Sequence, residues 1–178
     1  MDKADKNYQK LIQDAKSIIT NNGLDGLSIR KLATQSKVSV GYLYNYFENK
    51  DALLNALSQD FYINHLHDRI CKIDLDITFI DYLESLYLVL KEQSYFLAIY
   101  PALSSDFKSH LSSGIEKVLL ADSRIDKDLF INTKSDDLSQ YIVDHMLYTL
   151  TQEKSQFAIF INLLTNTLYK EKNNEKNN

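Results

Sequence analysis

The sequence contains little glycine and proline, with four glycines and one proline among 178 residues. Tight turns depend heavily on these two residue types, so their scarcity predicts a mostly helical chain with few turns. It also argues against a β-sheet fold, which needs many reversals of the chain. We therefore expect an all-α fold, and the 44% hydrophobic content is enough to build a substantial core.

The chain also lacks the usual features of secreted and membrane proteins. Its single cysteine, Cys71, has no partner for an internal disulfide, which indicates a reducing compartment and a packing role rather than a redox sensor. The polar start MDKADKNYQK does not resemble a signal peptide. No stretch approaches the roughly 20 apolar residues of a membrane span. We expect a cytoplasmic protein without a membrane partner.

Enzyme motifs are missing as well. The sequence shows no glycine-rich phosphate loop, no nucleophile with an evident base and no His/Cys cluster with metal-ligand spacing. His65 and His67 are two residues apart, so on a helix they point about 200° away from each other and cannot share a metal. We expect a protein that is not an enzyme and that has no catalytic residues, metal or cofactor.

The net charge of −4 argues at first against a nucleic-acid partner, but the charges are unevenly distributed. Residues 1–50 hold eight Lys and Arg against five Asp and Glu, whereas residues 51–178 hold twelve against nineteen. A basic N-terminal segment is the charge pattern expected of a nucleic-acid contact. Because the excess is small, specific binding is expected to need two copies of the chain.

The strongest local pattern is LSIRKLATQSKVSVGYLYNYFENKDALL, at residues 27–54. It predicts two short helices, over residues 29–36 and 40–47, each preceded by a serine that can cap the first turn. Leu43 and Phe47 are four residues apart and point inward together. Two helices joined by a tight turn form the geometry that places the second helix in the DNA major groove.

The outward face of the second helix fits contact with DNA. Gly41 has no side chain, so the backbone can approach DNA closely there, and Tyr42 and Asn45 offer hydrogen-bonding groups to base edges. The hydroxyls of Tyr44 and Tyr46 suit phosphate oxygens. The predicted DNA-contacting residues are Ser28, Arg30, Ser39, Val40, Gly41, Tyr42, Tyr44, Asn45, Tyr46 and Lys50.

Several of these positions have a structural alternative. Val40 either touches a thymine methyl or packs with the buried face, and Tyr44 is partly a core residue and partly a phosphate contact. Lys50 lies at a helix N-terminus, where amides favour an anion. Arg30 lies on the outer side of its helix, and Asn49 is interpreted as a helix cap rather than a base reader.

Together these residues resemble the DNA-binding domain of the TetR family of bacterial transcriptional regulators. The residues that carry the resemblance are Ala33, Val38-Ser39, Gly41, Leu43-Tyr44, Tyr46-Phe47, Lys50 and Leu53-Leu54. One feature departs from the family, which usually has an Ala-Gly pair in the turn. Here the pair is Ser36-Lys37, so a lysine occupies a position that favours positive φ.

The resemblance implies a helix–turn–helix domain over residues 1–50 and a larger helical effector-binding and dimerisation domain over residues 51–178. Periodicity predicts the first helix over 5–22, with a stop at Asn21-Asn22-Gly23. Later helices are predicted over 50–70, 77–93, 95–100, 103–120, 135–150 and 153–170, with polar segments over 72–76 and 122–134. Ser135 is expected to cap its helix, ahead of acidic residues in the first turn.

The last two helices are apolar on more than one face, which exceeds what one core-facing stripe requires. In the TetR family these helices pair with their copies in a four-helix dimer interface, and central burial explains the pattern almost as well. The predicted interface residues are Ile142, Met146, Phe157, Phe160, Ile161, Leu164 and Leu168.

The resemblance also implies a pocket for a small-molecule effector of unknown identity. The candidate residues are aromatic or histidine side chains, each of which is otherwise an ordinary core residue: Tyr82, Tyr87, Phe96, Tyr100, Phe107, His110, Tyr141, His145 and Tyr148.

The sequence thus predicts a homodimeric repressor that binds a palindromic, double-stranded DNA operator. The effector is expected to favour a head spacing that misses successive grooves and so releases the operator. The alternative is a TetR-fold interaction protein that acts through another regulator.

Overall fold

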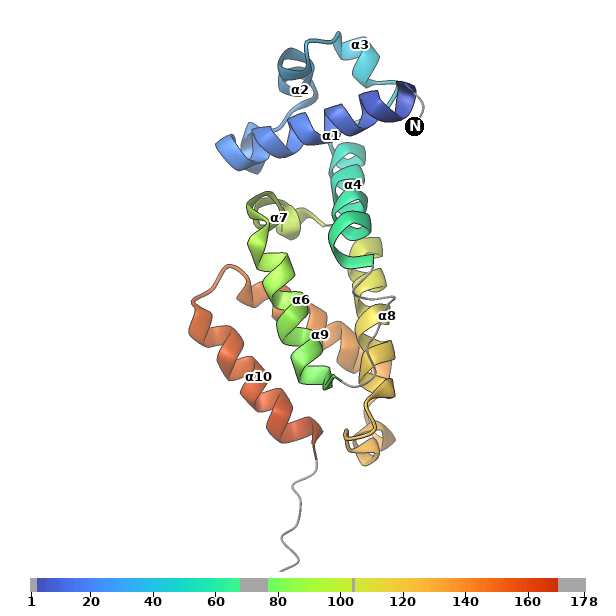
Figure 1. Cartoon of the computed structure of the whole chain (residues 1–178), viewed down its shortest axis with the longest axis vertical. Coiled ribbons are helices and arrows are strands. Elements are labelled where there is room, and N and C mark those ends of the chain that lie inside the picture. The colour runs from blue at the N-terminus through green and yellow to red at the C-terminus, as the bar shows by residue number, and fades with distance from the viewer. Residues whose placement is uncertain (1–2, 68–76, 104, 170–178) are drawn as a thin grey trace, which may run out of the picture. The chain divides into compact units, whose positions relative to one another are not determined.

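The computed structural model describes residues 3–67, 77–103 and 105–169. In that part of the chain every named element is helical, and the one β-type pairing is an isolated bridge between Ile125 and Tyr169. The all-α prediction is therefore confirmed (Figure 1). Cys71 and the polar segment predicted over 72–76 lie outside the described residues.

The elements in chain order are α1 (Lys3–Asn22), η1 (Leu24–Gly26), α2 (Ile29–Ser36), α3 (Val40–Leu43), α4 (Lys50–Phe61), η2 (Tyr62–Leu66), α6 (Phe79–Glu92), α7 (Ser94–Ile99), η3 (Tyr100–Ala102), α8 (Ser105–Ala121), η4 (Lys127–Ile131), α9 (Ser135–Thr149) and α10 (Lys154–Leu168). They form two compact units. Unit 1 consists of Met1–Asp68 with Val89–Phe107, and unit 2 of Arg69–Leu88 with Lys108–Asn178. None of the described helices is long and apolar enough to cross a membrane.

In unit 1, α1 packs against α2 and α4 through a continuous apolar stripe. The stripe residues are all buried: Leu11, Ile12, Ala15, Ile18 and Ile19. Leu32 of α2, Leu43 of α3 and the following Phe47 are buried as well. Each large apolar side chain contributes roughly 1.5–3 kcal/mol on burial, so this small core is enough to hold the two short helices in place.

The turn after α2 has the positive φ that the resemblance to the TetR family implies. Lys37 has φ 57° and ψ 43°, and it is the one described non-glycine residue with positive φ. Its backbone N–H ends α2 by bonding to the carbonyls of Ala33 and Thr34. Gly23, which follows α1, also has a positive φ of 69°, but with ψ 178° it lies in a different region of backbone space that glycine occupies without strain.

Replacing Lys37 by glycine is therefore expected to raise the free energy of unfolding by about 0.5–1 kcal/mol. Glycine removes the left-handed strain, and its greater freedom in the unfolded chain offsets part of that gain. Urea unfolding measures the change. The control is Gln35→Gly, inside α2, which is expected to lower stability by about 1 kcal/mol. If Lys37→Gly is less stable than the original protein, the left-handed conformation of Lys37 does not cost stability.

The second helix of the motif is shorter than predicted. Only Val40–Leu43 is α-helical, and the next residues form turns in which Asn45 N–H bonds to Tyr42 O and Tyr46 N–H to Leu43 O. The segment is rich in glycine, β-branched and aromatic residues, which are weak helix formers. Phe47 N–H still bonds to Leu43 O at 2.9 Å, so the two core side chains keep their helical register.

The helix predicted over 50–70 ends its α-helical part at Phe61 and continues as the π-helical η2. A π-turn brings residues five apart onto one side. Phe61 and Leu66, which are five apart, are both fully buried, whereas Ile63 is exposed. The change from an α-helical to a π-helical period therefore keeps the apolar side chains on the buried face. A sequence pattern of strictly α-helical period does not predict this change.

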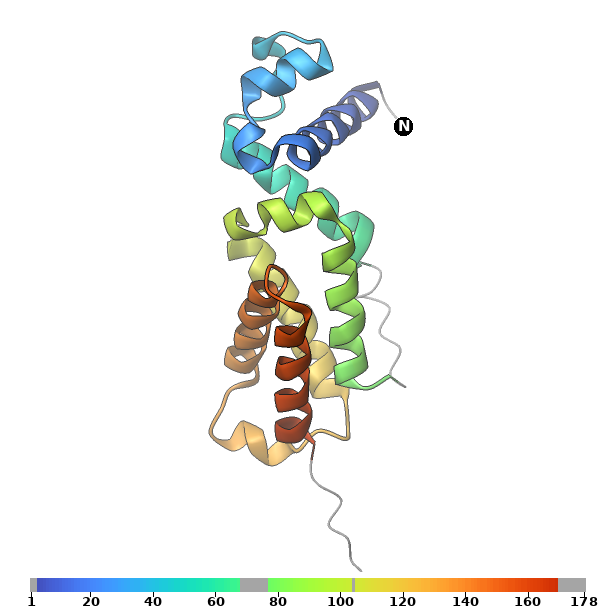
Figure 2. The ribbon, with the colours of Figure 1, turned by 90° about the vertical axis from the view of Figure 1, so that its left-hand side faces the viewer.

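In unit 2, α9 packs against α10, as Figures 1 and 2 both show. The N-terminus of α9 differs from the prediction. Ser135 is its first helical residue, and its hydroxyl donates to the Glu116 carboxylate, so it does not cap the helix. The preceding Lys134 occupies the cap position without a side-chain bond. Asp136 and Asp137 do lie in the first turn, where acidic side chains favour the helix dipole.

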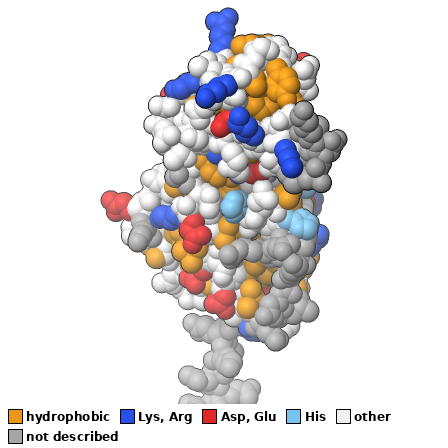
Figure 3. Space-filling view, turned by 45° about the horizontal axis from the view of Figure 1, so that its top comes forward, with side chains coloured by type: hydrophobic (Ala, Val, Ile, Leu, Met, Phe, Trp, Pro, Cys, Tyr) orange, Lys and Arg blue, Asp and Glu red, His pale blue; other side chains and the backbone are white. Residues whose placement is uncertain are grey.

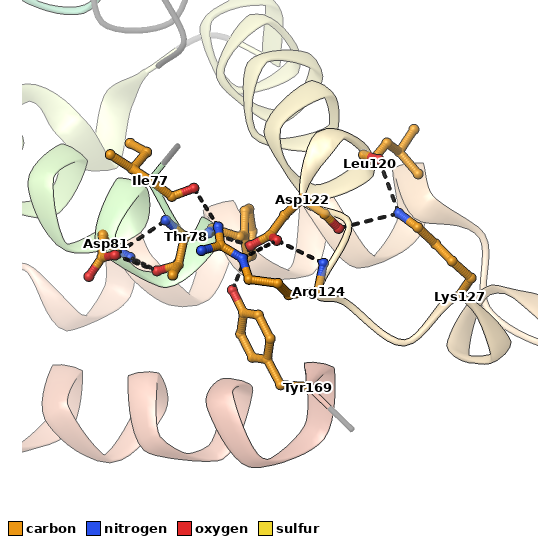
Figure 4. A network of polar contacts seen from close by, with 9 residues as sticks. Ile77, Thr78, Asp81, Leu120, Asp122, Arg124, Lys127 and Tyr169 are labelled. Carbon is orange, nitrogen blue, oxygen red and sulfur yellow. Dashed lines mark hydrogen bonds and ion pairs between the residues drawn. The ribbon is translucent and has the colours of Figure 1, made fainter. Parts of the chain in front are cut away.

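A buried carboxylate joins three segments of unit 2 (Figure 4). Asp122, which follows α8, accepts hydrogen bonds from the Phe79 N–H at 2.8 Å and the Tyr169 hydroxyl at 2.9 Å. It also accepts bonds from the N–H and Nε of Arg124, at 3.0 and 2.7 Å. Arg124 Nη2 in turn donates to Ile77 O at 2.7 Å. This network fixes the start of α6 and the end of α10 to the end of α8.

Candidate nucleic-acid interface

The α2–turn–α3 region of unit 1 is fixed by the two predicted serine caps. Ser28 Oγ accepts from Lys31 N–H at 3.1 Å, and Ser39 Oγ accepts from Tyr42 N–H at 3.1 Å. Each cap satisfies a backbone donor that has no partner within its helix. Both helices therefore start at positions set by the local sequence, which in turn sets the direction of the side chains on α3.

The ten predicted DNA-contacting residues differ in exposure. Ser28, Arg30, Ser39, Gly41, Tyr44 and Asn45 are exposed, and Val40, Tyr42, Tyr46 and Lys50 are half-buried. With 56% of its surface exposed, Tyr44 lies outside the core of the single chain and is open to a phosphate. Val40 keeps both of its predicted roles, because half-burial is compatible with packing and with contact to a methyl group.

Gly41 lies on the exposed face of α3. A methyl group built at its Cα would meet only the Ser39 hydroxyl, at 4.0 Å, so the protein itself leaves room for a side chain. The fold therefore does not require glycine here. Close approach of another molecule would explain the residue instead, as predicted for the DNA backbone or bases.

Lys50 and Asn49 lie at the start of α4. Asn49 Oδ1 accepts from Ala52 N–H at 2.8 Å, which confirms its interpretation as a helix cap. Lys50 Nζ donates to Leu24 O at 3.2 Å and so ties α4 to η1. An ammonium group has three donors, so this bond leaves two for an anion near the helix N-terminus.

Tyrosine side chains cluster beside the motif. The hydroxyls of Tyr42 and Tyr46 are 3.1 Å apart and their ring centroids 5.4 Å. Tyr8 of α1 packs near Tyr46 and Phe47, with centroids 6.3 and 5.9 Å away. Burial, and then the charge of Asp60, raise the pKa of Tyr8. Tyr8 was not among the predicted site residues, because its position beside Tyr46 depends on how α1 crosses the motif.

Basic side chains surround this region. Lys6, Lys10, Arg30, Lys31 and Lys37 are all exposed on α1, on α2 or just after α2. Figure 3 shows Lys and Arg side chains next to a patch of side chains coloured as hydrophobic, a class that includes Tyr. Lys31 is partly engaged, since its Nζ donates to Asn22 Oδ1 at 3.0 Å. The distribution matches the predicted basic footprint.

Behind the motif, a buried ion pair links α1 to α4. Lys16 Nζ lies 2.5 Å from Asp60 Oδ2, and both side chains are largely shielded from solvent. The same ammonium lies 4.9 Å from the centroid of Tyr95 in α7, a cation–π contact. These contacts fix α1, and with it the residues that support α3, to the other helices of unit 1.

The nine predicted effector residues are divided between the two units. Phe96 and Phe107 are buried in unit 1 beside Phe61, with Phe96 stacked on Phe61 at 4.1 Å, and Tyr100 is half-buried in the same unit. In unit 2, Tyr87 stacks on Phe157 at 3.6 Å. Tyr82 is buried there and His110, Tyr141 and Tyr148 are exposed, with His145 half-buried.

One groove collects two of these residues. It lies in unit 2, has a volume of about 310 Å³, and is lined by Leu129, Thr133, Leu138, Tyr141, His145, Phe160, Leu163, Leu164, Thr167 and Leu168. The His145 ring lies 4.5 Å from the Phe160 ring and 5.8 Å from that of Tyr141. The groove is mostly apolar, with a few polar groups at its wall.

The seven predicted interface residues are all buried within the single chain: Ile142, Met146, Phe157, Phe160, Ile161, Leu164 and Leu168. The large apolar side chains that α9 and α10 leave exposed are Tyr141, Tyr148, Ile159 and Leu163. Ile159 and Leu163 were not among the predicted interface residues. Their spacing of four residues, on the face of α10 away from Phe157, was the signal for a second apolar stripe.

Within the described residues, no group of three or more His, Cys, Asp or Glu side chains is arranged to hold a metal ion. His65 packs against Phe61, with ring centroids 5.1 Å apart. Its pKa is lowered, chiefly by burial and then by the Lys16 charge. His67 is exposed.

Residues 11–57 match the family model described as "Bacterial regulatory proteins, tetR family". The uncharacterized HTH-type transcriptional regulator YvdT of Bacillus subtilis is 33% identical over 63 residues, 35% of this chain and 32% of the relative. Tetracycline repressor protein class D of Escherichia coli is 37% identical over 62 residues, 35% of this chain and 28% of that protein. The chain thus matches about a third of the length of these relatives.

Similarity to solved structures extends much further along the chain. A TetR-family transcriptional regulator from Haemophilus influenzae RD superposes with a TM-score of 0.58 and covers 96% of this chain and 100% of its own. The sequences are 16% identical, so this likeness concerns the fold alone. The match to the family model covers residues 11–57, and structural similarity extends to the helices that follow them.

Proposed function

We propose that the chain is a TetR-family repressor that binds a palindromic operator as a homodimer, because residues 11–57 match the family model of bacterial regulatory proteins. The observation that supports this most is the capped α2–turn–α3 unit, with Gly41, Tyr44 and Asn45 exposed on or just after α3. A motif that served only to bind another protein would not need both a glycine on its exposed face and hydrogen-bonding side chains beside it. We further propose that the protein acts in the cytoplasm.

The proposed dimer forms through the exposed apolar side chains of α9 and α10. Ile159 and Leu163 lie four residues apart on α10, and Tyr141 and Tyr148 add aromatic surface from α9. Exposed apolar side chains on two helices that pack together are typical of interaction sites. A dimer would place two heads about 34 Å apart, which matches successive major grooves of a palindrome.

The first test compares Lys50→Ala with the original protein on an operator duplex and on a random duplex. Lys50 has donors left for a phosphate, so we expect the variant to weaken both complexes by a similar factor of about two to five, and to reduce the salt slope by about one. Fluorescence anisotropy at several salt concentrations measures both quantities. Lys134→Ala, which removes an exposed lysine in unit 2, is the matched control and should leave binding unchanged. Absence of binding to any duplex would contradict the proposal.

We propose that the effector is a small, largely apolar molecule bound by unit 2. The groove beside Tyr141 and His145 supports this, because its volume of about 310 Å³ and its apolar lining fit a small-molecule site. One relative is named a tetracycline repressor, a name that includes a small molecule. Since the proposed interface uses the same face, a bound molecule would alter the spacing of the heads and shift the population away from the DNA-binding form.

Titrating candidate compounds into the operator complex tests this effector mechanism. Lack of release of the operator over a broad screen would contradict it.

A further inference from the structure

A charged pair is buried within unit 1. Lys16 Nζ of α1 lies 2.5 Å from Asp60 Oδ2 of α4, and the two side chains are only 13% and 5% exposed. The Lys16 ammonium also lies 4.9 Å from the ring centroid of the buried Tyr95 in α7. A lysine shielded in this way is not available to a DNA phosphate, unlike the exposed Lys6 and Lys10 of the same helix. The pair therefore has another role.

Stability does not account for the two charges. Moving an ammonium and a carboxylate out of water is costly, and their attraction offsets this cost only where hydrogen bonds satisfy the remaining polar atoms. Here Asp60 Oδ2 and the Tyr95 hydroxyl are buried, and apart from the ion pair neither atom has a hydrogen-bond partner in the part of the chain that the structure describes. Apolar side chains of similar volume at positions 16 and 60 are expected to hold α1 and α4 together at least as well.

The ion pair is directional, whereas the apolar contacts of α1 are not. The hydrophobic effect acts without direction, so the apolar stripe of α1 tolerates small shifts and rotations of the helix. The ion pair and the cation–π contact together need the ammonium at one place relative to α4 and α7. Lys16 and Asp60 thus specify where α1 lies within unit 1.

The nearly opposite side of α1 holds the DNA-binding motif. Asp14 lies two residues before Lys16, which places it about 200° away around the helix. Its carboxylate accepts a hydrogen bond from Ser36 Oγ at 2.7 Å, and its backbone carbonyl accepts one from Gln35 Nε2 at 3.1 Å. Ser36 is the last residue of α2 and directly precedes the turn that leads to α3. The placement of α1 therefore sets the placement of this turn.

We propose that Lys16 and Asp60 are positioning residues for operator recognition, which fix α1 in one placement at some cost in stability. Helix α1 then carries this placement from α4 and α7 to the α2–turn–α3 motif. Neither residue contacts DNA, and their effect is to keep the side chains of α3 in one orientation toward the bases. The inference rests on the proposed function, because it concerns the discrimination between operator and random DNA.

The double variant Lys16→Met with Asp60→Leu tests this role, since it replaces the charged pair by apolar side chains of similar volume. Its thermal melting temperature is expected to equal or exceed that of the original protein. The DNA probes are the operator duplex that the original protein enriches from a random pool and a random duplex of equal length. We expect the ratio of operator to random affinity, measured by fluorescence anisotropy, to fall about three- to tenfold in the double variant.

Two control variants separate placement from charge. Lys16→Arg keeps a cation beside Asp60 and the Tyr95 ring, so it should retain the affinity ratio to within about twofold. Lys10→Met removes an exposed charge from the same helix. It should leave the ratio unchanged even if both affinities fall, because a phosphate contact does not discriminate between sequences.

An unchanged affinity ratio in a stable double variant would overturn the inference. A double variant that melts well below the original protein would overturn it too, because the pair would then serve stability. If the original protein enriches no sequence, the proposed function fails instead, and hydrogen exchange of the free protein still tests the placement of α1. Faster exchange of the amides of residues 28–47 in the double variant supports the positioning role, and unchanged exchange contradicts it.

Discussion

Replacing Leu163 by Asp is expected to convert the dimer to a monomer and to reduce operator affinity by about 100-fold or more. In the single chain 62% of the Leu163 side chain is exposed, so the substitution costs little in folding. In the proposed dimer the same position is covered, and a buried carboxylate without a partner is strongly unfavourable. Two linked heads bind far more tightly than one, because the second contact is intramolecular.

The matched control is Asn162→Asp, which adds the same charge about 100° away around α10. Asn162 is exposed and accepts a hydrogen bond from Asn166, which an aspartate would keep. Sedimentation measures the oligomeric state, and anisotropy measures operator binding. If Leu163→Asp remains a dimer, the interface lies on another surface and the proposed role of the exposed α10 stripe is wrong.

Replacing Asp122 by Asn is expected to lower the free energy of unfolding by about 3 kcal/mol. The carboxylate is buried and accepts four hydrogen bonds, one of them from the charged Arg124 guanidinium. An asparagine has one acceptor oxygen in place of two, so at least one buried donor loses its partner. Urea unfolding at pH 7 measures the loss. Asp137→Asn, an exposed change at the start of α9, is the control and should shift stability by less than about 0.5 kcal/mol.

Asp122 also makes the free energy of unfolding depend on pH. Burial by itself would raise the pKa of Asp122, but the bond with Arg124, followed by those with the Phe79 and Arg124 backbones and Tyr169, lowers it to about 2. The pKa in the folded state is thus below that of the unfolded chain, so the unfolded chain binds a proton more readily. The stabilisation of about 2 kcal/mol is present above about pH 5 and is lost as the pH falls toward 2. Asp122→Asn should flatten the stability profile over this range, and an unchanged profile would contradict this role.

The parts of the fold that were predictable from sequence depend on residues close together in the chain. The caps by Ser28 and Ser39, the inward pair of Leu43 and Phe47, and the left-handed turn at Lys37 are all local patterns. The caps and the inward pair follow from side-chain chemistry and spacing, whereas the turn at Lys37 was implied by the resemblance to the TetR family. This is why the helix–turn–helix was predictable almost residue by residue, with the exception of the shortened second helix.

The rest depends on contacts between distant residues. The link from Asp122 to Tyr169 joins positions 47 residues apart, and no local pattern marks either residue. The position of Tyr8 relative to Tyr46 follows from the crossing of α1 over the motif. Periodicity likewise identified the apolar residues of α9 and α10, but it did not distinguish those that face the protein's own core from Ile159 and Leu163, which remain exposed.

The most direct test of a dimeric, operator-binding regulator is selection of bound sequences from a random duplex pool with the purified protein. The account predicts enrichment of a palindrome whose half-site centres are separated by about one helical turn of DNA or a multiple of it. Enrichment should be lost in Leu163→Asp and retained in Asn162→Asp. Folded, dimeric protein that enriches no sequence would contradict the account.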